Sequence, residues 1–451
     1  MKVAFCLRNF LPQHAGGTEV YVAALCGGLQ RLGVETFIIK PGFNRTEVTE
    51  YFYNELRIIE YPEPSAATKD IIQGKEAPAG LAFFGQVMVK EKPDVIHFHD
   101  ITGSNGITTR HLAICKNLRI PIFTTLHLAG YVCKTGTLKY KGNVSCDGLI
   151  DTYKCSVCTL HEKGLRAGLP EILTGLGMIA EKWQGAFKVL PGNVRSGLSY
   201  PEYIRRHKAV LETIFSNSEK VFVLSNWFKA VLLKNQLPEN KMILLEKALP
   251  HSQIPVMKRI SSVESDDKQL RFVYLGRISW IKGLHVILEA LAGMKNKNWS
   301  LDIYGQVLEE PYFEKCKALA AKVSGNVTWK GILSPAAVLQ TLSRYDALIF
   351  PTIIEEMVGL VVMEAFAAKI PVIGSAVKGI AEQVEDGKTG ILFEAGNAKE
   401  LKNILERVTT TPSILTNLAG NIRLPGNFGD VACHSLKIYE SVLMEKTVNL
   451  T

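Results

Sequence analysis

The sequence predicts an α/β protein made of two doubly wound domains. Short apolar runs alternate with helical segments along most of the chain, and the alternation falls into two runs on either side of a polar, proline-bearing linker at 251–269. The 451 residues and 47% hydrophobic content are enough for two full-sized cores. Alternating strands and helices give parallel sheets covered by helices, with ligands at the carboxyl ends of the strands.

The N-terminal run predicts a domain over residues 1–250. Strands are expected in KVAFCL, VETFII, DVIHFH, IPIFTTL and KVFVLS, with helical segments such as EVYVAALCGGLQRLG between them. The last of these strands follows a long stretch of different character, at about 128–200, which we interpret as an insertion that carries clustered cysteines.

The C-terminal run predicts a second domain over residues 270–428. Its strands are expected in LRFVYLG, LDIYG, VTWKG, ALIFP, PVIGS and GILFE. We expect the remaining residues, 429–451, to form a helix that packs back on the N-terminal domain.

Charge and hydropathy limit the class of protein. The net charge of +9 suits an anionic ligand or an acidic membrane surface, although a solvated basic surface gives the same value. No basic cluster or aromatic signature argues for nucleic acid. No uncharged apolar stretch reaches the roughly 18 residues of a membrane span, and the N-terminal apolar run is too short for a signal peptide. We therefore expect a cytoplasmic protein. The apolar helical segment 168–190 predicts peripheral contact at the inner face of the membrane, or else a buried helix pair.

A basic turn is predicted in YLGRISWIKGLHVILEAL. Gly276 and Arg277 end a strand, and Lys282 and Gly283 open a helix. A lysine at a helix start is unfavourable by about 0.3–1 kcal/mol because of the helix dipole. An anion held between Arg277, Lys282 and the helix start would make the position of this lysine favourable instead. The alternative is two solvated cations in a loop.

An acidic turn is predicted in IIEEMVGLVVMEAFAAKIPVIG. Pro351 ends a strand, Glu356 lies in the following loop, and a helix begins near Leu360 and carries Glu364 in its first turns. Backbone N–H groups at that helix start point at whatever lies between the two acids. The alternative is that Glu356 is a solvated loop acid and that the carboxylate of Glu364 complements the helix dipole. Phosphates suit the basic turn and hydroxyl groups the acidic one, so a sugar nucleotide suits both.

These motifs, with GIAEQVEDGKTGILFE and the N-terminal GGTE, resemble the retaining glycosyltransferases of family 4. The resemblance covers nearly the whole chain and is most specific in the C-terminal half. It implies the GT-B fold, in which two Rossmann-like domains face a central cleft, with the acceptor side in the N-terminal domain and the nucleotide sugar in the C-terminal domain.

The resemblance also implies roles for single residues. Arg277 and Lys282 would hold the donor diphosphate, Glu364 the ribose hydroxyls, and Glu356 the transferred sugar. Because the two cations and the helix start would stabilise the departing diphosphate, we expect no cofactor or metal to be required for catalysis.

Three further positions complete the predicted donor site. Backbone groups around Gly359 and Leu360 would contact the donor between the two acids. The nucleotide base of the donor is expected near Gly331. Its contacts there would come from the backbone, so the sequence does not identify the base.

The N-terminal half supplies fewer candidates. Gly16 and Gly17, between the first strand and the first helix, either let a backbone approach the donor or simply form a tight turn. His127 matches a strand-end histidine that lies near sugar and acceptor in the family, with a structural histidine as the alternative. We also expect His97 and His99 to point to opposite faces of their strand, so that at most one is available to the cleft.

Four cysteines within 26 residues form a separate motif. Cys133, Cys146, Cys155 and Cys158 end in a C-x2-C pair and could bind structural zinc, with His161 as a substitute ligand. Free thiols, a disulfide or a redox role are the alternatives. The other five cysteines are scattered and read as small buried hydrophobes.

The sequence thus predicts a retaining glycosyltransferase that moves a sugar from a nucleotide donor to a saccharide or lipid-linked acceptor, with surface polysaccharide or glycolipid synthesis as its setting. A sugar-nucleotide epimerase with the same fold, or a non-catalytic sugar-nucleotide-binding subunit, remains as an alternative. Release of nucleoside diphosphate only when acceptor is present separates the transferase from both.

Overall fold

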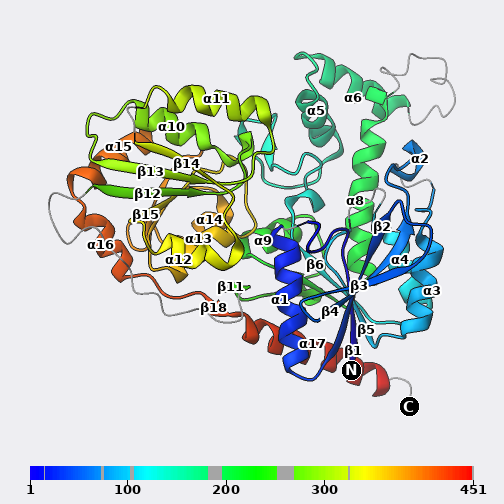
Figure 1. Cartoon of the computed structure of the whole chain (residues 1–451). Helices are drawn as coiled ribbons and strands as arrows, with labels where there is room; N and C mark the ends of the chain where they lie inside the picture. Colours follow the sequence, from blue (N-terminus) through cyan, green and yellow to red (C-terminus); the bar gives the residue numbers. More distant parts are fainter. Residues whose placement is uncertain are drawn as a thin grey trace. The chain divides into compact units, whose positions relative to one another are not determined.

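The computed structural model describes residues 1–14, 16–72, 76–101, 106–180, 196–250, 269–323 and 326–448. The chain divides into two compact units, of which unit 1 is Met1–Glu246 with Phe428–Thr451 and unit 2 is Lys247–Asn427. Figure 1 follows the chain through both units. Apart from Gln269, the linker predicted at 251–269 lies outside the described residues.

Unit 1 contains an eight-stranded sheet in the order β10-β9-β6-β5-β1-β2-β4-β3. All its neighbouring strands are parallel except β3 and β4. Its central strands are apolar runs without alternation, because both faces of the sheet are covered by helices. The bounds are β1 (Lys2–Cys6), β2 (Glu35–Phe43), β3 (Thr49–Tyr53), β4 (Leu56–Glu63), β5 (Val95–Phe98), β6 (Ile122–Leu126), β9 (Lys220–Val223) and β10 (Met242–Leu244).

The C-terminal helix α17 belongs to unit 1, where it packs against α1. Tyr439 of α17 is fully buried, and its hydroxyl lies 2.6 Å from Nδ1 of His97 in β5. The helices of this unit outside the insertion are α1 (Gly17–Arg31), α2 (Lys69–Ile72), α3 (Leu81–Glu91), α4 (Thr109–Asn117), α8 (Tyr200–Asn217), α9 (Asn226–Lys234) and α17 (Phe428–Val448), with the 3-10 turn η3 (Glu239–Lys241).

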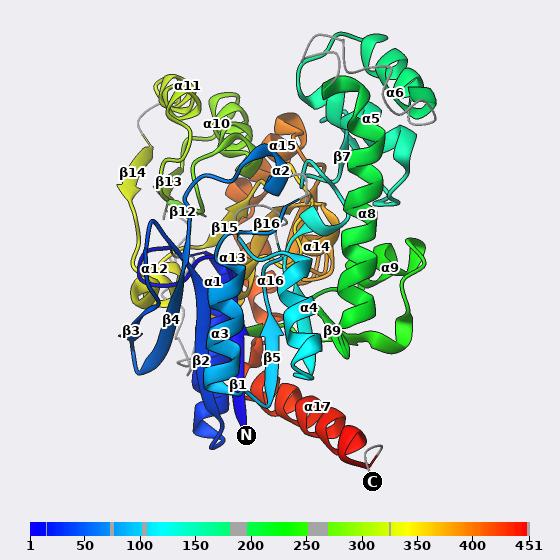
Figure 2. The ribbon, with the colours of Figure 1, turned by 90° about the vertical axis from the view of Figure 1, so that its right-hand side faces the viewer.

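The predicted insertion after β6 is largely irregular at its start and helical later. The helices α5 and α6, within its described residues, pack on each other and on α8, as Figure 2 shows. Residues 181–195, which include the end of the apolar segment 168–190, lie outside the described residues. The elements are η1 (Ala129–Tyr131), β7 (Lys139–Tyr140), β8 (Val144–Ser145), α5 (Thr152–Glu162) and α6 (Leu169–Ala180).

Unit 2 contains a six-stranded, wholly parallel sheet in the order β14-β13-β12-β15-β16-β17. The strands are β12 (Leu270–Leu275), β13 (Trp299–Tyr304), β14 (Val327–Gly331), β15 (Ala347–Phe350), β16 (Val372–Ser375) and β17 (Gly390–Phe393). The short strands β11 (Ala248–Leu249) and β18 (Gly426–Asn427) pair separately.

Helices cover both faces of this sheet, with α10, α11 and α15 on one side and α12 and α13 on the other (Figure 1). Successive residues of β12 alternate between two hydrophobic cores, Phe272 and Tyr274 in one and Val273 in the other. This confirms the doubly wound α/β class predicted from the sequence. The helices and turns are η4 (Trp280–Lys282), α10 (Leu284–Ala292), α11 (Glu310–Ala320), η5 (Pro335–Ala337), α12 (Val338–Leu342), α13 (Leu360–Ala367), α14 (Lys378–Ala381), α15 (Ala398–Thr410) and α16 (Ser413–Gly420).

Candidate active site

The strand order of unit 2 reverses between β12 and β15, which are hydrogen-bonded neighbours. The chain continues from β12 toward β13 and β14 on one side, and from β15 toward β16 and β17 on the other. In open α/β sheets such a switch point leaves a crevice at the carboxyl ends of the strands, where ligands bind. The predicted basic turn follows β12 and the predicted acidic turn follows β15, so both lie at this switch point.

The basic turn differs in one detail from the prediction. Lys282 ends the short 3-10 turn η4, and the helix α10 begins only at Leu284. Gly283 separates the two because it adopts a left-handed conformation with φ of +71°. A Cβ atom there would lie 2.0 Å from the carbonyl oxygen of Pro351. Glycine is therefore required both for the turn and for its close approach to the end of β15.

The structure brings Lys282 and Glu356 together, although they are 74 positions apart. Their side chains form an ion pair and are only 17% and 16% exposed. The Thr352 hydroxyl also donates to Glu356 Oε1 at 3.0 Å. The cation expected at the phosphates and the acid expected at the sugar thus balance each other's charge when no donor is present.

Two residues that the sequence reasoning missed hold the acidic loop in place. Buried Glu355 accepts a 2.7 Å hydrogen bond from the backbone N–H of Lys378, at the start of α14. The side-chain amide of Gln383 hydrogen-bonds both backbone groups of Gly359, accepting from its N–H at 2.7 Å and donating to its carbonyl at 3.2 Å. Such contacts reach backbone groups, so no residue pattern in the sequence marks them.

The helix α13 begins at Leu360, as predicted, with Gly359 as its N-terminal cap. Glu364 is partly buried on this helix. Because the N–H of Gly359 already donates to Gln383, a donor phosphate would need the N–H groups that follow it, or displacement of Gln383.

The remaining donor candidates lie at neighbouring strand ends. The side chain of Arg277 is exposed, and its carbonyl accepts from the Tyr274 hydroxyl at 2.8 Å. Gly276 follows β12 directly, and Gly331 ends β14 with φ of +73°. Ser279 lies between Arg277 and Lys282 in the sequence. Its buried hydroxyl has no hydrogen-bond partner among the residues that the structure describes.

Unit 1 has a corresponding switch point between β1 and β5. Gly17 is the first residue of α1, and Gly16 is its cap. The carboxylate of Glu19, which is buried, accepts from the Gly16 N–H at 2.9 Å and contacts Nδ1 of His14 at 2.9 Å. A Cβ atom at Gly16 would lie 2.6 Å from that carboxylate, so glycine leaves room for the internal cap of the helix.

The prediction that His97 and His99 point to opposite faces is wrong. Residues two apart in a strand share a face, and these two rings have centroids 4.1 Å apart. Nδ1 of His99 lies 2.9 Å from Nε2 of His127, at the end of the neighbouring strand β6. Burial lowers the pKa of His127 to about 3 and that of His99 well below its usual range, so both rings are neutral near pH 7.

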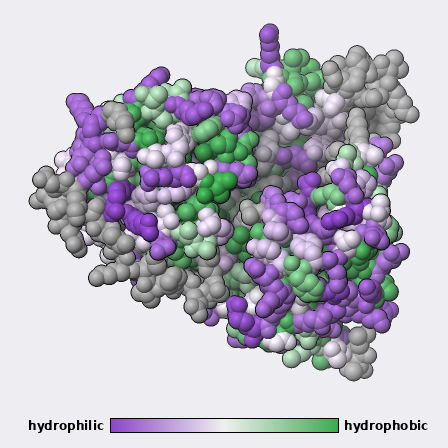
Figure 3. Space-filling view, viewed as in Figure 1, coloured by the Kyte–Doolittle hydropathy of each residue, from purple (hydrophilic) through white to green (hydrophobic). Residues whose placement is uncertain are grey.

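The helix α6 presents an apolar face to solvent. Leu169, Ile172, Leu176 and Ile179 recur at helical spacing and are each between 49% and 60% exposed. Figure 3 shows hydrophobic and hydrophilic residues interspersed over the visible face of the molecule. Among the described residues no helix is both long and apolar enough to cross a membrane.

Two family profiles match the chain. The family described as glycosyl transferases group 1 matches residues 258–423, and glycosyltransferase family 4 matches residues 15–144. An uncharacterized glycosyltransferase of Methanocaldococcus jannaschii is 22% identical over 451 residues, covering 98% of both chains. The alpha-D-kanosaminyltransferase of Streptomyces kanamyceticus is 27% identical over 158 residues, which are 35% of this chain and 40% of that protein.

Solved structures share the fold of the whole chain. Sucrose-phosphate synthase of Thermosynechococcus elongatus superposes with a TM-score of 0.66 at 16% identity, covering 98% of this chain and 99% of that one. Anabaena HepE in complex with UDP-glucose superposes with a TM-score of 0.58 at 14% identity, covering 100% of both.

The chain is therefore a glycosyltransferase with the GT-B fold, whose two doubly wound units and strand-end motifs agree with that class. More narrowly, it is of the family 4 type, since the family 4 profile matches residues 15–144 and the group 1 profile matches residues 258–423.

Proposed function

We propose that this enzyme transfers a sugar, with retention of configuration, from a nucleoside diphosphate sugar to a saccharide or lipid-linked acceptor. The observation that carries the proposal is the Lys282–Glu356 pair at the switch point of unit 2, where a cation for phosphate and a carboxylate for hydroxyl groups lie side by side. The complex of the structurally similar HepE with UDP-glucose supports a donor of this chemical class.

In this proposal Lys282 exchanges its carboxylate partner for the donor diphosphate, and Arg277 supplies the second cation. As the bond to the sugar breaks, negative charge grows on the leaving diphosphate and these fixed cations stabilise it. They do the work that a divalent metal does in other transferases, so turnover proceeds without added magnesium.

Glu356, released from Lys282, faces the sugar, where positive charge develops. Glu364 on α13 takes the ribose hydroxyls, and the turn at Gly331 lies toward the base. The buried hydroxyl of Ser279, between Arg277 and Lys282 in the sequence, is a further candidate donor to the phosphates, because it has no hydrogen-bond partner among the described residues.

His127 is proposed to act on the acceptor side. In the neutral form that its low pKa imposes, one ring nitrogen accepts a hydrogen bond and the other donates one. His99 contacts Nε2, so the tautomer of His127 depends on that neighbour and Nδ1 is the nitrogen left for a substrate hydroxyl.

A thermal-shift panel of UDP-, GDP- and ADP-sugars tests the donor. A donor at about 100 times its dissociation constant adds about 2.7 kcal/mol to the free energy of unfolding. Turnover is then followed as release of nucleoside diphosphate with and without added acceptor. Release that requires acceptor supports transfer, whereas epimerised donor without acceptor, or binding without turnover, favours the alternatives.

We further propose that the acceptor is met at an anionic lipid surface through the apolar face of α6. Exposed Lys163 and Arg166 immediately precede this helix, and its own Glu171 is paired with Lys141 at 2.9 Å, so the neighbourhood has the charge that anionic lipids attract. Flotation with vesicles containing phosphatidylglycerol should show binding at low salt that Ile172→Ser weakens and high salt removes. Absence of binding at low salt would point to a soluble acceptor.

A further inference from the structure

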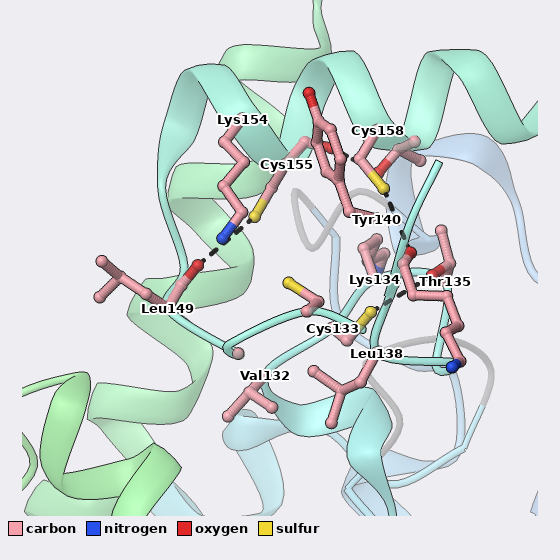
Figure 4. A pocket seen from close by; sticks show the side chains of 14 residues that line it. Val132, Cys133, Lys134, Thr135, Leu138, Tyr140, Leu149, Lys154, Cys155 and Cys158 are labelled. Atoms are coloured by element: carbon pink, nitrogen blue, oxygen red, sulfur yellow. Dashed lines mark hydrogen bonds between the residues drawn. The ribbon is translucent and has the colours of Figure 1, made fainter. Parts of the chain in front are cut away.

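A pocket in unit 1 collects all four clustered cysteines. Cys133 lies just after η1, Cys146 just after β8, and Cys155 and Cys158 one turn apart on α5. Figure 4 shows the side chains of Cys133, Cys155 and Cys158 around this space. Thiols that are up to 25 positions apart in sequence therefore line one cavity, which the C-x2-C spacing by itself did not establish.

The β-hairpin that precedes α5 is very short. Its strands β7 and β8 have only two residues each, with Cys146 directly after β8 and Cys133 in the segment before β7. Val132 and Leu138, in the segment before β7, are buried apolar residues that line the pocket. Segments with so little core of their own commonly depend on a disulfide or a metal ion.

Each thiol at present has a weak partner of its own. The Lys141 N–H donates to Cys158 Sγ at 3.2 Å, Cys133 Sγ lies 3.2 Å from the Thr135 hydroxyl, and Cys155 Sγ donates to the Leu149 carbonyl at 3.8 Å. As the side chains stand, no three His, Cys, Asp or Glu residues within the described ranges are spaced to hold an ion. None of the four cysteines is in a disulfide.

The pocket also holds a backbone donor beside one of its thiols. A backbone N–H such as that of Lys141 is a hydrogen-bond donor suited to a metal-bound thiolate, and it already points at Cys158. The cavity therefore offers sulfur ligands and a donor to support one of them.

We propose that this pocket is a structural zinc site, with Cys133, Cys146, Cys155 and Cys158 as its four ligands. Four thiolates in tetrahedral array select zinc among the common divalent ions. Binding would require the four side chains to rotate toward one another, and each thiol would give its proton to solvent as it binds. The ion would join the hairpin to α5 and so fix the segment that follows His127. The proposal does not depend on the identity of the donor or the acceptor.

The test is metal analysis of the full chain, purified under reducing conditions from cells grown with zinc. We expect about one zinc per chain, released by a mercurial that titrates thiols, and a melting temperature that falls when a strong chelator removes the metal. Cys155→Ser and Cys158→Ser should lose most of the zinc. Cys433→Ser, at another partly buried cysteine but on α17 outside the pocket, is the matched control and should keep it.

If the variants do not fold, the parent protein alone still tests the zinc proposal. Replacement of the metal by Co²⁺ should produce thiolate-to-cobalt charge transfer and the visible bands of a tetrahedral site. Metal-free parent with nine titratable thiols would overturn the proposal, as would disulfides among the four cysteines, iron with visible absorption, or full zinc retention in Cys155→Ser.

Discussion

Removing either partner of the Lys282–Glu356 ion pair should change the affinity for the free nucleoside diphosphate in opposite directions. Lys282→Ala removes a charge-assisted contact to phosphate, which is worth about 1.5–3 kcal/mol and predicts roughly 10- to 150-fold weaker binding. Glu356→Gln keeps the shape and the hydrogen bond from Thr352 but frees Lys282 in advance.

Glu356→Gln should bind the nucleoside diphosphate more tightly, because its Lys282 is no longer in an ion pair that must first be broken. Both side chains are mostly buried, at 17% and 16% exposure, so breaking their pair costs at least the roughly 0.5–1 kcal/mol of an exposed pair. The diphosphate no longer has to overcome that cost in Glu356→Gln, and binding should tighten by at least about 2- to 5-fold. The kcat of the same variant should fall by about 100-fold or more, because the carboxylate acts on the sugar as the bond breaks.

Titration calorimetry with the nucleoside diphosphate that stabilises the protein most gives the affinities, and steady-state kinetics gives kcat. Glu385→Gln is the matched control, since Glu385 forms an exposed 2.5 Å pair with Lys388 in the same unit and should change neither quantity. If Glu356→Gln weakens diphosphate binding as strongly as Lys282→Ala does, the two residues do not compete in the way we describe. A near-parental kcat would remove Glu356 from the sugar side.

Three further predictions concern neighbouring groups. Glu364→Ala should mainly raise the donor KM, because a ribose contact is made equally in the ground and transition states; a selective fall in kcat would contradict the ribose assignment. Gly283→Ala should lower both the melting temperature and donor affinity, since its Cβ would lie 2.0 Å from the Pro351 carbonyl oxygen, and an unchanged melting temperature would refute this reading of the turn. Burial depresses the pKa of His99 and of His127, so the unfolded chain binds more protons below about pH 6.5 and each histidine should reduce stability by up to about 1.4 kcal/mol per pH unit as the pH falls. Asp100, whose pKa burial raises to about 6, opposes part of this slope, and urea midpoints at pH 7 and 5.5 should show a smaller loss in His99→Gln than in the parent; an equal loss would show that His99 is not a source of the slope.

The central strands were predictable because parallel strands covered on both faces must be apolar throughout. The hairpin of β3 and β4 was not recognised, since charged residues interrupt its apolar ones. Buried Glu60 of β4 pairs with Lys40 of β2 at 2.7 Å, and a single sequence does not show that such charges neutralise each other. The helix start at Leu360 was found from a proline and a glycine, which act locally.

The site was predictable in its residue types and less so in its contacts. Lys282 and Glu356 were both named, yet their pairing depends on β12 and β15 being neighbours in the sheet, a long-range property of the fold. Glu355 and Gln383 were missed because they act through backbone groups. The error over His97 and His99 was one of strand geometry, since the period of two places them on the same face.

The return of α17 to unit 1 determines the order in which the protein can be completed during synthesis. The partner of His97 in its buried hydrogen bond is Tyr439, 342 positions later, so unit 1 lacks part of its core until nearly the whole chain has left the ribosome. Unit 2 is a continuous segment, Lys247–Asn427, and can finish folding before the last helix emerges. Unit 1, whose sequence begins the chain, is thus completed last, and a stop codon between Phe428 and Tyr439 would leave unit 1 unfinished while sparing unit 2.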